Sequence, residues 1–228
     1  MLSFGDPRPH AKSIKDRGAV LICQGQDIES AHLAMQAGAD FIVAQGTEAG
    51  GHGGARATLP LVPAVVDAVA PLPVLAAGGI SDGRGVAAAL MLGTEGALIG
   101  TRFYASQQAL GAAAAKREIT TRRGGDTLRT QVFDIVRGYD WPAPYTGRAV
   151  RNDFIARWHG NEAALAASLD VERPAYFSAA QAEDVATAVV WAGEGIDMID
   201  AVEDAARLVV RIGAQTEAQL NRGVNLLR

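Results

Sequence analysis

Four short apolar segments that alternate with helical segments constrain the fold of this chain most strongly. The strand-like segments lie near residues 19–24, 40–45, 73–78 and 96–101, and the helix-like segments lie near 28–37, 60–70 and 84–92. Strands and helices that alternate at this spacing form βαβ units, in which the strands are parallel and covered on both faces. Leu2-Ser3-Phe4-Gly5 adds the end of one further strand. The pattern predicts an α/β protein built on a parallel sheet.

Glycines follow the ends of the predicted strands. Residues 44–54 read Ala-Gln-Gly-Thr-Glu-Ala-Gly-Gly-His-Gly-Gly, and the next two strands end in Gly78-Gly79 and Gly100-Thr101. In a (β/α)8 barrel, the loops after the last two strands and a nearby helix N-terminus bind phosphate through backbone N–H groups. A hydroxyl such as that of Thr101 can donate one more hydrogen bond. Gly78, Gly79, Gly100 and Thr101 are therefore candidate ligands of a cofactor phosphate.

Three further polar side chains are candidates for a site. Gln24 and Gln45 end two predicted strands, and their amides can both donate to and accept from a ligand, or else bond the local backbone. His52 is the only titratable side chain between Gly50 and Gly54. An imidazole suits proton transfer near neutral pH, so His52 is the candidate catalytic residue. The alternatives for His52 are a flexible surface turn or a helix cap.

These motifs resemble those of the nitronate monooxygenase family, formerly called 2-nitropropane dioxygenases. The matching pieces are Ala49-Gly50-Gly51-His52, Ala76-Ala77-Gly78-Gly79-Ile80, Gly100-Thr101-Arg102-Phe103, residues 126–130, residues 148–159 and residues 189–195. The resemblance covers nearly the whole chain. It implies an FMN-dependent TIM barrel that oxidises alkyl nitronates with O2 to a carbonyl compound and nitrite. It further implies that Gly50 and Gly51 let the backbone pass against the flavin ring. His52 would then bind the nitro group or remove the α-proton of a neutral nitroalkane.

Within that resemblance, residues 1–118 are expected to supply about strands 4–8 of the barrel, and residues 119–228 a mainly helical lid. Helices are expected at residues 104–118, 177–192 and 198–221. The first three barrel strands are expected to be absent from this sequence. A fragment, a late start codon or completion of the half-barrel by homo-oligomerisation would each account for their absence.

Composition excludes several other classes of function. The net charge of −4 argues against a nucleic-acid partner, and no stretch approaches the 18 apolar residues of a membrane span. The single cysteine, Cys23, suits a reducing cytoplasm and is expected in the core. The scattered histidines predict no metal site. The expected partners are a small nitronate or nitroalkane and O2.

The sequence leaves the roles of other charged residues, and other functions, open. Glu48 is expected either to orient His52 or to be exposed. Arg102 is expected in an outer salt bridge rather than at the phosphate. A reach of Glu194 from the lid to the substrate is the less favoured option for that residue. A related flavin- and NAD(P)H-dependent enoyl-acyl-carrier-protein reductase is the first alternative function. A truncated, flavin-free and non-catalytic remnant is the second.

Overall fold

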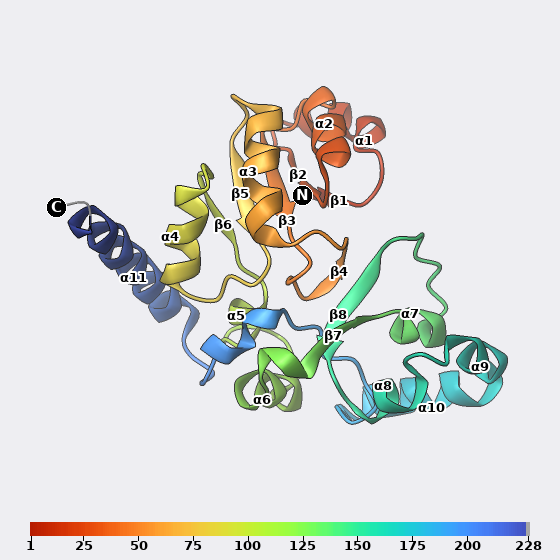
Figure 1. Cartoon of the computed structure of the whole chain (residues 1–228). Coiled ribbons are helices and arrows are strands. Elements are labelled where there is room, and N and C mark those ends of the chain that lie inside the picture. The colour runs from red at the N-terminus through yellow and green to blue at the C-terminus, as the bar shows by residue number, and fades with distance from the viewer. Residues whose placement is uncertain (227–228) are drawn as a thin grey trace. The chain divides into compact units, whose positions relative to one another are not determined.

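The computed structural model describes residues 1–226, whose contacts separate into two compact units. The first unit comprises residues 1–48, 54–99 and 209–226, and the second comprises residues 49–53 and 100–208. Figure 1 shows the elements of both units, which are described here one after the other. The division at residue 118 into barrel and lid stays a prediction.

The first unit is an α/β structure with a five-stranded parallel sheet. In spatial order, its strands are β1 (Leu2–Ser3), β2 (Ile22–Gly25), β3 (Phe41–Gln45), β5 (Val74–Ala77) and β6 (Gly96–Leu98). The helices between the strands are α1 (Arg8–Lys15), α2 (Ile28–Gln36), α3 (Thr58–Val69) and α4 (Gly83–Met91), and α11 (Ala205–Asn225) joins this unit from residue 209 (Figure 1). The predicted parallel sheet is thus confirmed, whereas its closure into a barrel stays a prediction.

Local sequence explains where two of these helices begin. The Asp27 carboxylate accepts from the Ser30 N–H at 2.7 Å, and the Asp82 carboxylate accepts from the Arg84 N–H at 2.9 Å. Such N-caps satisfy backbone donors that would otherwise lack a partner, and each is worth about 1 kcal/mol. Cys23 is buried in the apolar core of the sheet, as expected, and burial raises the pKa of its thiol.

The second unit is built around a three-stranded antiparallel sheet. Its strands are β4 (Gly51–Gly53), β8 (Thr146–Val150) and β7 (Thr127–Thr130), with β8 in the centre. Its helices are α5 (Thr101–Tyr104), α6 (Ala113–Thr121), η1 (Gly124–Asp126), α7 (Val132–Arg137), α8 (Asp153–Trp158), α9 (Glu162–Ala167), α10 (Leu169–Gln181) and η2 (Glu194–Met198). The predicted flexible turn around His52 is therefore wrong, because that residue lies in a strand.

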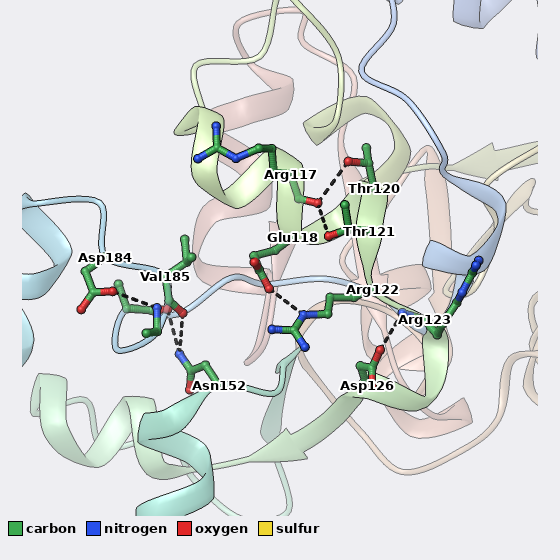
Figure 2. Close-up of polar contacts among 12 residues, drawn as sticks. Arg117, Glu118, Thr120, Thr121, Arg122, Arg123, Asp126, Asn152, Asp184 and Val185 are labelled. Atoms are coloured by element: carbon green, nitrogen blue, oxygen red, sulfur yellow. Dashed lines mark hydrogen bonds and ion pairs between the residues drawn. The ribbon is translucent and has the colours of Figure 1, made fainter.

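The predicted helix over residues 177–192 is also wrong beyond Gln181. Beyond Gln181, backbone carbonyl groups that would accept hydrogen bonds within a helix accept them from residues 150 and 152 instead. The Asn152 amide donates to the Val185 carbonyl at 3.1 Å (Figure 2), and the Val150 N–H donates to the Val190 carbonyl at 2.9 Å. Residues 182–188 consequently form turns, and the chain is then bridged to β8 at Trp191, opposite Ala149.

Two other helices begin later than predicted, and one strand ends earlier. The helix expected over residues 198–221 begins at Ala205. The helix expected over residues 104–118 is interrupted, because the Lys116 ammonium donates to two carbonyl groups of the loop before it. The strand expected to reach residue 101 ends at Leu98, so Gly100 and Thr101 begin the short helix α5.

Candidate functional site

His52 is fixed by the small antiparallel sheet of the second unit. It lies in β4, directly opposite Gly147 of β8. A Cβ atom at Gly147 would overlap the ring of Trp191, so the glycine makes room for that ring beside His52. The centroids of the His52 and Trp191 rings are 5.2 Å apart. A histidine that the sequence places in a loop is thus held by a β-ladder and an aromatic neighbour.

A buried carboxylate holds one nitrogen of this histidine. Both carboxylate oxygens of Asp134 lie 2.9 Å from His52 Nε2. The side chains of Asp134 and His52 are only 3% and 13% exposed. Sequence reasoning missed Asp134, although one signal was present. It is the only charged residue in the apolar run Val132–Val136, where a buried acid requires a partner.

The flat face of His52 is covered by Trp141. The two rings stack with centroids 3.8 Å apart and an angle of 10° between their planes. Beside them is a pocket of about 700 Å³. Its lining is aromatic and charged, and consists of His52, Arg137, Gly138, Tyr139, Asp140, Trp141, Pro142 and Trp191. This pocket could accept a small organic molecule against the imidazole.

A second contact fixes the strand that carries His52. The Arg129 guanidinium of β7 donates to the Gly53 carbonyl at 2.6 Å and to the carbonyl of Thr146. Burial, with the charge of Arg148 beside it, lowers the pKa of Arg129 to about 10. Arg129 thus ties the end of β4 to β7 and β8.

The two predicted glutamines meet in the first unit. Gln45 Oε1 accepts from Gln24 Nε2 at 2.7 Å and from Gln26 Nε2 at 2.8 Å. The side chains therefore bond to one another, in addition to any bond to the local backbone that the sequence offered as the alternative. Gln26 was missed by sequence reasoning, although it lies directly after β2. The role of Gln24 and Gln45 towards a cofactor stays a prediction.

The Gly78-Gly79 turn after β5 has a backbone that only glycine adopts readily. The φ angles are +109° at Gly78 and +71° at Gly79. No hydrogen bond among residues 1–226 uses the N–H of Gly79. Glu48 lies against this turn and is half-buried, and its carboxylate accepts from the Thr58 hydroxyl at 2.7 Å. The expectations for Glu48, an exposed side chain or the residue that orients His52, are therefore corrected.

The remaining predicted cofactor contacts lie in the second unit. A Cβ atom at Gly50 would be 2.7 Å from the Ala192 carbonyl carbon, so close packing already requires glycine there. Gly51 has a φ of +76°. The Thr101 hydroxyl oxygen accepts from the Gly193 N–H at 3.0 Å, which leaves its hydrogen to donate. A Cβ atom placed on Gly100 would have no other part of the described chain within 4 Å, so the space beside this glycine is open.

The contacts of two charged residues, Arg102 and Glu194, can be compared with those that the sequence predicts. Arg102 is fully buried rather than in an outer salt bridge, and it donates to the Ala201 carbonyl at 2.6 Å with Glu203 at 3.6 Å. Glu194 is half-exposed and lies 3.5 Å from Arg148. Its proposed reach to a substrate stays a prediction.

Residues 1–226 lack two kinds of feature. No group of three His, Cys, Asp or Glu side chains there is arranged to hold a metal ion. None of the helices in this part of the chain combines the length and the hydropathy of a membrane span.

Comparison with known proteins identifies the family. Residues 1–214 match the family described as nitronate monooxygenase. The chain belongs to the nitronate monooxygenase family. The nitronate monooxygenase npaC of Metarhizium robertsii is 35% identical over 209 residues, which are 86% of this chain and 57% of that protein. A probable nitronate monooxygenase of Staphylococcus aureus is 39% identical over 149 residues, 60% of this chain and 42% of that protein. This family member therefore spans about half the length of these curated relatives.

Solved structures are similar over almost all of this nitronate monooxygenase family chain. FabK from Thermotoga maritima matches with a TM-score of 0.86 and 27% identity, covering 98% of this chain and 69% of that one. A nitroalkane oxidase from Streptomyces ansochromogenes matches with a TM-score of 0.78 and 31% identity, covering 97% and 65%.

Proposed function

We propose that this chain is part of an FMN-dependent oxidoreductase that converts alkyl nitronates and O2 to a carbonyl compound and nitrite. The observation that carries the proposal is His52, held by Asp134 in an aromatic pocket of a nitronate monooxygenase family member. FMN, when bound, would accept electrons from the nitronate and deliver them to O2.

The residues of the first unit fit the phosphate of FMN. At Gly78 and Gly79 the turn presents no side chain, and the N–H of Gly79 is available to an anion. Gln24 and Gln45 supply amide groups of the kind that ribityl hydroxyls or the polar edge of the flavin would bond. The cofactor contacts of Gly50, Gly51, Gly100 and Thr101 stay predictions of the family resemblance.

His52 is proposed to act on the carbon next to the nitro group. A neutral nitroalkane must lose a proton from that carbon before it becomes a nitronate. An imidazole that faces such a substrate can take that proton and hold the resulting anion. A preformed nitronate has already lost the proton, so for it His52 would only position the substrate. The two substrates therefore separate the two roles.

The test is His52→Asn in flavin-loaded protein, with the exposed His10→Asn as the matched control. Turnover of a neutral nitroalkane should fall by about 10²–10⁴-fold, the usual contribution of a positioned base, and turnover of the nitronate should fall much less. Flavin content should stay unchanged. Equal losses on both substrates would make His52 a positioning group, and no loss on either would place the active site elsewhere.

The likeness to FabK is compatible with the alternative of a flavin- and NAD(P)H-dependent enoyl-acyl-carrier-protein reductase. Bleaching of the bound flavin by NADH or NADPH without a nitronate would favour that reductase. A purified protein that neither is yellow nor takes up FMN would favour the non-catalytic remnant. A cytoplasmic location and a homo-oligomer remain predictions.

A further inference from the structure

We propose that Thr58 is a positioning residue that aims the backbone N–H of Gly79 at the phosphate of FMN. The role towards FMN rests on the proposed function, in which the Gly78-Gly79 turn binds that phosphate. The structural part of the inference, the orientation of one peptide group, concerns only the first unit and can be tested without a ligand.

The peptide group between Gly78 and Gly79 carries the donor in question. In a planar trans peptide, the carbonyl oxygen of one residue and the N–H of the next point in opposite directions. A contact that holds the Gly78 carbonyl therefore also fixes the direction of the Gly79 N–H. No hydrogen bond within residues 1–226 uses that N–H, so it is available to a ligand.

Two consecutive glycines do not fix the orientation of this peptide by themselves. Gly79 has a φ of +71°, and a half-turn of the peptide plane would change that angle to about −109°. Glycine adopts both values without steric cost. A contact outside the two glycines is therefore needed to keep the N–H on one side of the turn.

Thr58 supplies such a contact from the start of α3. Its hydroxyl oxygen lies 3.2 Å from the Gly78 carbonyl oxygen and 2.7 Å from a carboxylate oxygen of Glu48, so two acceptors share the single hydroxyl hydrogen. The Glu48 carboxylate also accepts from the Thr58 N–H at 2.9 Å. These two bonds to Glu48 hold the threonine side chain beside the Gly78 carbonyl.

Gly46, directly after β3, makes room for Thr58. A Cβ atom on Gly46 would overlap both the backbone and the hydroxyl group of Thr58, so a larger residue there would push the threonine away. The Gly46 N–H donates to the Ala77 carbonyl at 2.9 Å, which ties this glycine to the strand that leads into the turn. Gly46, Thr58 and the Gly78-Gly79 turn thus form one connected arrangement within the first unit.

The first experiment determines the orientation of the peptide by NMR in the ligand-free 228-residue chain. The couplings of the Gly79 amide hydrogen to its two α-hydrogens are similar in size when φ is near +71° and very unequal when φ is near about −109°. Wild type and Thr58→Ser, which keeps the hydroxyl, should show similar couplings, whereas Thr58→Val should shift towards unequal ones. Thr94→Val is the matched control and should behave as wild type, because Thr94 also donates to a glycine carbonyl of the first unit, that of Gly96 at 3.1 Å. Unequal couplings in the wild type, or unchanged couplings in Thr58→Val, would overturn the inference.

The second experiment separates the phosphate from the rest of the cofactor. FMN and riboflavin differ only in the phosphate, and flavin fluorescence measures the Kd of each. Thr58→Val should raise the Kd for FMN by about tenfold, the usual effect of losing a hydrogen bond to a charged group, and should change the Kd for riboflavin by less than about twofold. Thr58→Ser and Thr94→Val should bind both flavins as wild type does. An equal loss for both flavins would indicate a merely structural role and overturn the positioning role. If the wild type binds neither flavin, the proposed cofactor fails, while the couplings of Gly79 still decide how the peptide is held.

Discussion

The Phe133 ring packs against Trp191, which lines the pocket beside His52, and removing the ring should destabilise the second unit strongly. The ring is fully buried, and its centroid lies 5.7 Å from that of Phe154, 6.1 Å from Tyr176 and 5.8 Å from Trp191. Replacing a buried Phe by Ala costs about 3–5 kcal/mol, because the apolar contacts are lost and a cavity remains. Domains are stable by only about 5–15 kcal/mol. We therefore expect Phe133→Ala to lower the melting temperature by roughly 10–20 °C.

The protein carries its own probe for this measurement. All three tryptophans, at positions 141, 158 and 191, belong to the second unit, so tryptophan fluorescence follows that unit alone. The matched control is Phe177→Ala in α10, because that ring is 45% exposed and contacts only the edge of the same cluster. Its cost should stay within about 1 kcal/mol. A Phe133→Ala melting temperature equal to that of Phe177→Ala would refute the view that this cluster supports the site.

Two further outcomes are expected from the first unit. Gly79→Val should yield protein with little bound FMN but a normal circular dichroism spectrum, because valine adopts the φ of +71° poorly and its Cβ would lie 3.2 Å from the Glu48 Cβ, so that the turn must shift. Flavin absorbance relative to protein absorbance measures this, and full flavin content would contradict it. Lys15 donates to Asp40 at 2.6 Å and lowers the pKa of that carboxyl, which also accepts from the Leu21 N–H. Because the folded-state pKa is depressed, this contact stabilises the protein above about pH 4 and is lost on acidification. Lys15→Met should therefore lower the melting temperature at neutral pH, and the difference from wild type should shrink as the pH falls below about 4; a constant difference would argue against the ion pair.

The sequence predicts the first unit well because its signals are local. Most strands there are short apolar runs, and two of the helices begin at a residue whose side chain caps them, Asp27 for α2 and Asp82 for α4. The parallel order follows from the alternation of strands and helices. The second unit lacks such regularity. β4 is a Gly-His-Gly segment with almost no strand propensity, and its pairing with β8 crosses about a hundred residues, which no local pattern reveals.

The same distinction explains which part of the site was predictable. His52 is predictable as a candidate because it is the only titratable residue in a glycine-rich segment, and this signal is visible in the local sequence. Asp134 is 82 positions further along and is joined to His52 only by the fold. Its one local signal is a carboxylate inside an apolar run, and that signal says that a partner exists without saying which. An acid inside an apolar run and a histidine surrounded by glycines therefore suggest a hypothesis from the sequence alone. The hypothesis is that the two side chains contact each other in the folded protein. Here the 2.9 Å contact between them joins two weak observations into one arrangement, a histidine whose Nε2 is bound by a buried carboxylate.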